Sequence, residues 1–188
     1  MIKPRIVLSG IGALATVFCA GWLLLRLHTE TQYMGREGVV FQRGATDCGG
    51  AALKMIFDRF GITMDYGQLL SRLKTGATGT AMLNMKEVAE AEGLLCAGWR
   101  LAPRDLPVIP LPAILLIRTS HFVVMDSPYS AQGILVLDPA RGRLRLSMHK
   151  LLSVWNGESL LFCKPGVDSD RHGRWFGHSQ FKSRRNLP

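Results

Sequence analysis

A change in the spacing of hydrophobic residues, near the middle of the chain, constrains the fold more than any other feature. Up to Gly93, apolar residues recur every three or four positions, which predicts amphipathic helices. Beyond it they form short β-branched or apolar runs between turn residues, which predicts strands. Helices are expected at 48–60, 65–73, about 80–92 (capped by Thr80 or Asn84) and 147–155, and strands at 94–101, 113–118, 121–126, 133–138, 143–146 and 159–163. Helices followed by an antiparallel sheet make an α+β fold.

The stretch Gln42–Gly50 leads into the first helix and contains a candidate nucleophile, Cys48. Apolar residues at helical spacing follow and Gly61 is a stop signal, so Cys48 lies at or just before the first turn. Unpaired N–H groups and the positive end of the helix dipole should lower its pKa. Gln42 can fold back, so that its side-chain amide and the backbone N–H of Cys48 give two oxyanion donors. Alternatively, Cys48 is a small buried residue and Gln42 a polar loop residue.

His121 and Asp138 are the candidate partners of the cysteine, because His121 opens one predicted strand and Asp138 closes the next. If the hairpin is symmetric about its turn, Asp126 pairs with Gly133, and the same register pairs His121 with Asp138. Opposed residues point to one face, with Cβ atoms about 4.5–5.5 Å apart. Asp138 can then accept the imidazole N–H and leave the other nitrogen for Cys48. Asp126 is a rival acid, but its odd offset from His121 puts it on the opposite face. The alternative is a strand-end histidine bonded to backbone.

The order of these residues resembles that of the bacteriocin-processing cysteine peptidases (cysteine peptidase family 39), which cut leader peptides after a double glycine. The family pattern is a Gln, six residues on a Cys within Asp-Cys-Gly, and later a His and an Asp-Pro. Here the pattern is matched by Gln42, the motif at 47–49, His121 and Asp138 with the proline that follows it. The resemblance covers roughly 39–163. It implies a papain-like fold, in which the cysteine helix packs against a sheet that carries the histidine.

The combined prediction is a membrane-anchored, papain-like cysteine endopeptidase. Cys48 is the nucleophile, His121 the general base and then acid, Asp138 the orienting group and Gln42 an oxyanion donor. Acyl transfer through a thioester needs these roles and no metal or cofactor. The resemblance implies that the substrate is a secreted peptide or protein precursor with a Gly-Gly leader. The chain contains no Gly-x-x-x-x-Gly-Lys-Ser/Thr motif, so an ABC transporter or other secretion complex would be a separate partner.

Two other functions fit the same residues. Some relatives of the family have lost the cysteine or the histidine and act as non-catalytic, leader-binding domains that dock substrates to a secretion system. This chain keeps both residues, which favours catalysis. A different acyl-transfer reaction on the same triad, such as amidase or transpeptidase chemistry, is the other alternative.

The uncharged run Ile6–Leu25 predicts a transmembrane anchor, because its 20 residues would span about 30 Å as a helix. A cleaved signal peptide is the alternative, but cleavage after 13–15 would leave a long apolar stretch behind it. A short basic tail before a first span usually stays in the cytoplasm. This predicts a single-pass protein of the bacterial inner membrane with its catalytic domain outside the cytoplasm. The resemblance points to the other side, since exporter-linked members work in the cytosol.

The predicted domains are an N-terminal tail and anchor at 1–25, a linker at 26–38, a papain-like peptidase domain at 39–164 and a basic tail at 165–188. The net charge is +9, and the chain from Arg171 onward contains five basic residues and no acid. Such a run is typical of a solvated tail, which an anionic membrane surface suits as well as nucleic acid does. No nucleic-acid partner is predicted.

The four cysteines show no CxxC pair and no metal-ligand spacing, so no zinc site is predicted. Cys19 lies in the apolar N-terminal run, whereas Cys96 and Cys163 lie in strand-like runs where burial is expected. In an oxidising compartment these two could form a disulfide. His172 and His178 could bind metal only adventitiously, because nothing near them in the sequence completes a site.

Overall fold

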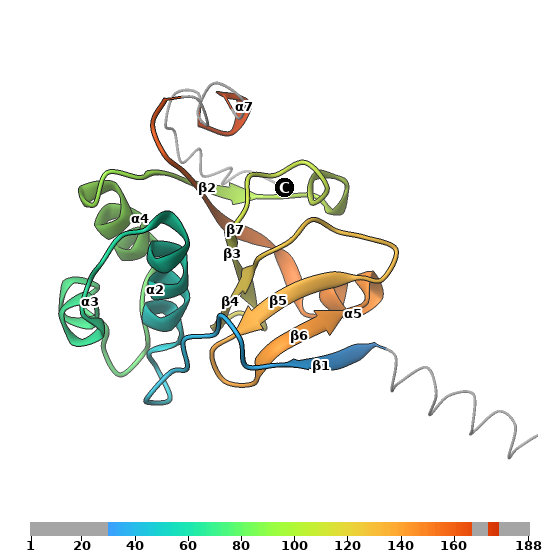
Figure 1. Cartoon of the computed structure of the whole chain (residues 1–188), viewed down its shortest axis with the longest axis horizontal. Coiled ribbons are helices and arrows are strands. Elements are labelled where there is room, and N and C mark those ends of the chain that lie inside the picture. The colour runs from blue at the N-terminus through green and yellow to red at the C-terminus, as the bar shows by residue number, and fades with distance from the viewer. Residues whose placement is uncertain (1–29, 167–172, 177–188) are drawn as a thin grey trace, which may run out of the picture.

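A computed structural model describes residues 30–166 and 173–176, with the three longest helices gathered on one side of a single sheet (Figure 1). The sheet has seven strands in the order β1-β6-β5-β4-β3-β7-β2, and the neighbouring pairs are antiparallel. This arrangement confirms the predicted α+β class.

Strands β2 to β7 follow the predicted apolar runs, whereas β1 was not predicted. The strands are β1 (Thr31–Gly35), β2 (Leu95–Arg100), β3 (Ala113–Ile117), β4 (His121–Met125), β5 (Ile134–Asp138), β6 (Gly142–Leu146) and β7 (Trp155–Cys163). The last strand begins four residues earlier than expected and contains Gly157. This glycine has a φ of +97°, and a Cβ there would lie 2.5 Å from the carbonyl oxygen of Leu101. Only glycine lets the strand continue past this close approach.

Three helices cover one face of the sheet: α2 (Cys48–Phe60), α3 (Tyr66–Arg72) and α4 (Met82–Ala91). In Figure 1, α2 lies next to the sheet and α3 lies beyond it, while α4 packs beside α2 and against β2. Helix α2 ends at Gly61, whose φ of +73° is the left-handed conformation expected of a glycine stop. The remaining helices are short: η1 (Pro103–Asp105), α5 (Met148–Leu152) and α7 (Gly173–Phe176).

The predicted cap of α4 is wrong. Its N-cap is Ala81, which has no side chain able to bond the free N–H groups. Thr80 Oγ1 is 2.8 Å from Thr75 Oγ1, and Asn84 Nδ2 donates to the carbonyl of Leu73 at 2.9 Å. Both polar side chains therefore hold the loop between α3 and α4 rather than the helix end.

The sheet has a hydrophobic cluster on each face, because successive buried residues of its central strands point to opposite faces. The helix-side cluster joins Ile56 and Phe57 of α2 to Ile114 and Val124. The cluster on the other face contains the intervening Leu115 and Val123, together with residues of β5, β6 and α5. Burial on both faces explains why β3 and β4 read as nearly continuous apolar runs.

Part of the predicted linker at 26–38 is a strand. Residues 31–35 form β1, which pairs with β6 and makes one edge of the sheet. Its exposed Gln32, Tyr33 and Met34 gave no alternating pattern in the sequence. The pairing partner lies more than 100 residues away, so only the tertiary structure identifies this strand.

The predicted solvated tail also differs from the structure over residues 173–176, which form α7. Trp175 is buried against Trp99 of β2, with the rings edge to face at 5.3 Å between centroids. Trp99 Nε1 donates to the carbonyl of Trp175 at 3.0 Å. The tryptophan, rather than the surrounding charges, decides where this turn packs.

The predicted anchor at 6–25 lies outside the described residues, and so do Cys19, His172 and His178. Within the described ranges, no helix is both long and apolar enough to cross a bilayer. Cys96 is a buried free thiol. The register places it opposite Phe162, whereas Cys163 is opposite Leu95. Neighbouring register positions face opposite sides of a sheet, which argues against the disulfide that was considered.

Candidate active site

Cys48 is the first residue of α2, as predicted, and it is buried with 6% of its surface exposed. The next residue, Gly49, explains how the cysteine comes close to the sheet. A Cβ on Gly49 would lie 2.9 Å from Cβ of Thr80 and 3.2 Å from Cδ2 of Phe122 in β4. Only a residue without a side chain lets the helix approach this closely. The Asp-Cys-Gly-Gly sequence is therefore also a packing motif.

The surroundings of Cys48 favour its thiolate. Burial raises the pKa of the thiol, but hydrogen bonds from His121 and from the backbone N–H groups of Phe122 and Gly49, with the charge of His121, lower the pKa overall. As a neutral thiol, Cys48 Sγ donates weakly to the carbonyl of Ser120 at 3.8 Å. Three donors against one acceptor account for the direction of the pKa change.

His121 and Asp138 meet as predicted, although the register that was assumed for them is wrong. His121 Nε2 lies 2.8 Å from Asp138 Oδ1. The hairpin pairs Val124 with Leu137 and Met125 with Val136, two residues away from the assumed register. A shift of two keeps every side chain on its face, so the two residues are diagonal neighbours. The longer connection between β4 and β5 absorbs the difference.

Asp138 holds the imidazole through a buried carboxylate, with only 4% of its side chain exposed. Its Oδ1 also accepts the backbone N–H of Ala140 at 2.8 Å. Burial lowers the pKa of His121, but the bonds to Asp138 and to the Cys48 thiolate outweigh it and raise this pKa to about 9. Burial raises the pKa of Asp138, whereas the bonds from His121 and Ala140 bring it below its usual value. With Nε2 directed at Asp138, Nδ1 is the nitrogen available to Cys48.

Gln42 lies beside this group because its backbone N–H donates to the carbonyl of Pro139, next to Asp138, at 3.1 Å. Its Nε2 donates to the carbonyl of Gly44 at 2.7 Å, which uses one of the two amide hydrogens. Its Oε1 is buried and has no partner in the described part of the chain. The side chain is fixed by the loop, and one N–H remains for an oxyanion.

Asp47 organises the same loop, a role that the sequence did not reveal. Its buried carboxylate accepts the backbone N–H groups of Arg43 at 2.9 Å and Gly44 at 3.0 Å, and the hydroxyl of Tyr66 at 3.0 Å. Burial raises the pKa of Asp47, and these three bonds lower it overall. Burial and the bond to Asp47 raise the pKa of Tyr66. An aspartate directly before a candidate cysteine was the available signal, but its bonding pattern depends on the three-dimensional turn.

The arrangement can carry out acyl transfer. A thiolate favoured by a neighbouring imidazole, with a buried carboxylate behind that imidazole, is the nucleophile–base–orienter set of a cysteine peptidase. The helix start supplies the nucleophile and the adjacent hairpin supplies the base and the acid.

Family comparisons agree with this class. The model of the peptidase C39 family matches residues 36–167. This match covers most of the chain, which therefore belongs to the peptidase C39 family and is a cysteine peptidase. The prediction made from Gln42, Cys48, His121 and Asp138 identified the correct family.

Curated relatives fall into two groups by length. The probable microcin-H47 secretion/processing ATP-binding protein MchF of Escherichia coli is 30% identical over 140 residues, which cover 70% of this chain and 20% of that protein. The probable functional amyloid protease FapD of Pseudomonas aeruginosa is 29% identical over 144 residues, which cover 71% of this chain and 62% of that protein. The chain thus spans about a fifth of the first relative and somewhat under two thirds of the second.

Solved structures share the fold. A double glycine motif protease from an AMS/PCAT transporter, crystallised with its leader peptide, has a TM-score of 0.63 at 26% identity and covers 70% of this chain and 96% of its own. The peptidase domain of Streptococcus ComA, a bifunctional ABC transporter, has a TM-score of 0.62 at 23% identity, covering 67% of this chain and 97% of its own. At that lower identity the likeness concerns the fold alone.

Proposed function

We propose that this protein is an endopeptidase that removes leaders from secreted peptide or protein precursors by cutting after Gly-Gly. The observation that carries the proposal is the bond between His121 and Asp138 at 2.8 Å beside the activated Cys48. The double-glycine specificity is supported by the related protease crystallised with its leader peptide. Two glycines suit a narrow approach to the scissile bond, because a side chain there would clash.

The proposed reaction has two stages, formation of a thioester and its hydrolysis, and the same side chains act in both. The Cys48 thiolate attacks the carbonyl carbon of the second glycine, and the oxyanion that forms accepts hydrogen bonds from the free N–H of Gln42 and the backbone N–H of Cys48. Protonated His121 gives its Nδ1 proton to the leaving amine as the peptide bond breaks, which leaves a thioester on Cys48. His121 then takes a proton from water, and the resulting hydroxide releases the leader as a carboxylic acid.

The proposal includes an anchor and a separate secretion partner. The uncharged run Ile6–Leu25 would hold the protein in the bacterial inner membrane, with the peptidase domain outside the cytoplasm. Peptidase domains of relatives such as MchF belong to ATP-binding secretion proteins. An ABC transporter or another secretion complex is accordingly the proposed partner of this chain, with the precursor as their shared substrate.

Cleavage of a synthetic precursor tests the proposal. Purified full-length protein and Cys48→Ala are incubated with versions that carry Gly-Gly, Gly-Ala, Ala-Gly or Ala-Ala before the scissile bond, and products are read by mass spectrometry. We expect cleavage after Gly-Gly alone, and none by Cys48→Ala. Equal rates on all four versions would contradict the specificity, and tight binding of an intact leader without cleavage would indicate a docking domain. Reporter fusions after Pro165 test the side of the membrane.

A further inference from the structure

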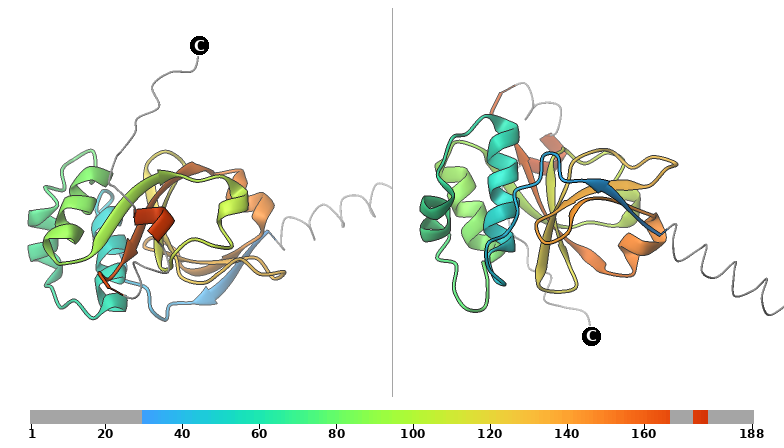
Figure 2. Two further views of the ribbon diagram at one scale, coloured as in Figure 1. Left: turned by 90° about the horizontal axis from the view of Figure 1, so that it is seen from above. Right: turned by 60° about the horizontal axis from the view of Figure 1, so that its bottom comes forward.

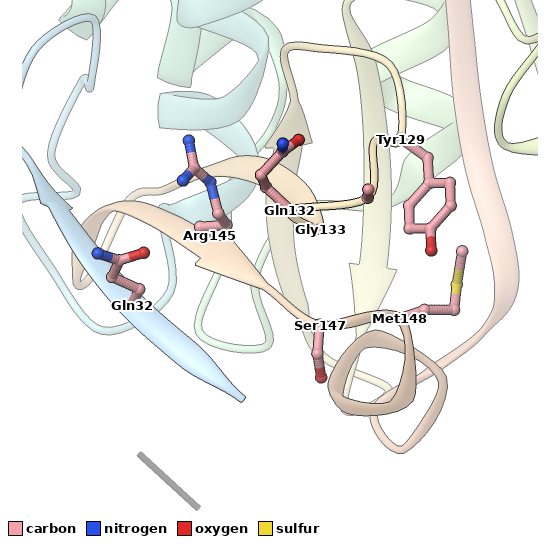
Figure 3. Close-up of a pocket in the computed structure, with 8 residues that line it drawn as sticks. Gln32, Tyr129, Gln132, Gly133, Arg145, Ser147 and Met148 are labelled. Carbon is pink, nitrogen blue, oxygen red and sulfur yellow. The ribbon is translucent and has the colours of Figure 1, made fainter. Parts of the chain in front are cut away.

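A hollow of about 340 Å³ lies away from the triad, at the opposite end of β5 from Asp138 (Figure 3). It is bounded by β1, the end of β6, the start of α5 and the turn that precedes β5. Its polar lining side chains are Gln32, Gln132, Arg145 and Ser147, and Tyr129 and Met148 line it as well. None of the residues proposed for peptide cleavage borders it.

Arg145 brings an uncompensated positive charge into this hollow. Its side chain is partly buried, and within residues 30–166 and 173–176 no acid lies at ion-pair distance from it. Arg143, two residues away on the same strand, does have an acidic partner, since it lies 3.6 Å from Glu37. Glu30 lies two residues before Gln32 on the chain, but its carboxylate is bonded to His149 at 2.7 Å.

The surroundings fix Arg145 and add donors around it. Gly133 has a φ of +110°, and a Cβ there would lie 3.5 Å from Cγ of Arg145, so the arginine stem packs on this glycine. Gln32 is directly opposite Arg145 in the pairing of β1 with β6, and both side chains therefore share one face. In Figure 3, Arg145 stands between the amides of Gln32 and Gln132, which come from different segments. The guanidinium and the two amides thus line the same hollow and come from three segments of the chain.

We propose that this hollow binds the phosphate group of a phosphate ester, with Arg145 as the charged partner and Gln32 and Gln132 as additional donors. Arg145 alone could satisfy the two oxygens of a carboxylate, whereas a tetrahedral phosphate presents oxygens to all three segments. The volume exceeds that of a phosphate. Tyr129 and Met148 give the organic part of the ester an apolar contact.

The same phosphate could come from a free metabolite-sized ester or from a phospholipid headgroup. Gln32 follows Leu25, the end of the uncharged run, by seven residues, which reach at most about 25 Å when extended. If that run is an anchor, the hollow lies within reach of the headgroups. The phosphate site itself depends on neither the anchor nor the peptidase activity.

Binding is measured on the full-length chain in maltoside micelles, by ³¹P NMR line broadening of sn-glycerol 3-phosphate and of inorganic phosphate. We expect saturable broadening in wild type and at least about a tenfold weaker affinity in Arg145→Gln, since a charged hydrogen-bond pair is lost. Arg143→Gln is the matched control, because it removes one positive charge from the same strand, and it should change the affinity less than about twofold. Far-UV circular dichroism and thermal melting confirm that each variant is folded.

Further measurements distinguish a lipid headgroup from a free phosphate ester, and a specific phosphate site from a general effect of charge. If the lipid headgroup is the natural ligand, phosphatidylglycerol added to the micelles displaces glycerol phosphate. If a free phosphate ester is the natural ligand, glycerol phosphate stays bound. Equal weakening in Arg145→Gln and Arg143→Gln would show a general charge effect and overturn the site. Displacement by acetate at the same concentration as phosphate would overturn the phosphate assignment. Absence of saturable binding in wild type would refute the proposal altogether.

Discussion

Replacement of Asp138 by asparagine isolates the charge that supports the imidazole. The asparagine Oδ1 can still accept the bonds from His121 and from the Ala140 N–H, so the side-chain geometry is kept while the negative charge is lost. The pKa of His121 stands at about 9, against an ordinary value of 6.5. This difference corresponds to roughly 3 kcal/mol, at about 1.4 kcal/mol for each pH unit.

The expected loss in Asp138→Asn is smaller than this total. The Cys48 thiolate contributes to the same pKa, and 22% of the His121 side chain is exposed to solvent that screens the charge. We assign about half, or roughly 1.5 kcal/mol, to the Asp138 charge. The pKa of His121 should therefore fall by about one pH unit, and kcat/KM should fall about tenfold. Asp138→Ala also removes the hydrogen bond and should cost more, about 100-fold.

Two measurements check this expectation. Histidine C2–H resonances followed against pH give the pKa of His121, which is assigned by its disappearance in His121→Gln. The rate of Cys48 alkylation by iodoacetamide against pH reports the same pair from the thiolate side. An unchanged pKa of His121 in both Asp138 variants would refute the view that this carboxylate supports the imidazole, whatever happens to activity.

Three further predictions concern the rest of the site. Gln42→Ala should lower kcat by about 100- to 1000-fold with a nearly constant KM, and a normal kcat would make Gln42 a loop residue only. Gly49→Ala should lower kcat/KM at least about tenfold in a folded protein, because the added methyl group pushes α2 away from the sheet. Gly50→Ala should cost less activity, because its methyl group meets only the flexible end of a leucine side chain. Equal activities of the two variants would contradict this packing role. Because folding raises the pKa of His121, its protonation stabilises the folded protein. This contribution is fully present below about pH 6.5 and is lost as the pH rises through about 9. The difference in Tm between wild type and His121→Gln should therefore shrink over that range.

Local patterns in the sequence were sufficient for most helices and strands and for the proximity of His121 to Asp138. The start of α2 at Cys48 and its end at Gly61 follow from spacing and from glycine's conformational freedom. His121 and Asp138 were paired correctly although the register was two residues off, because side-chain direction in a strand repeats every two residues.

Features set by distant contacts could not be predicted in this way. Strand β1 has a polar, exposed sequence and exists because β6 is available to pair with it. The role of Asp47 depends on a turn that places two backbone N–H groups and the Tyr66 hydroxyl around one carboxylate. No residue spacing in the sequence reports such a convergence.

The contact between Trp175 and Trp99 has a consequence for solubility. Strand β2 is an outer strand of the sheet, and an uncovered outer strand is a template on which other chains can add strands and aggregate. Helix α7 lies against β2 (Figure 2), and its Trp175 covers part of the Trp99 indole, which is still 39% exposed and would be more so without α7. A chain truncated after Gly166 keeps every residue of the triad. It should nevertheless self-associate at concentrations where the full-length protein stays dispersed, which sedimentation velocity would detect.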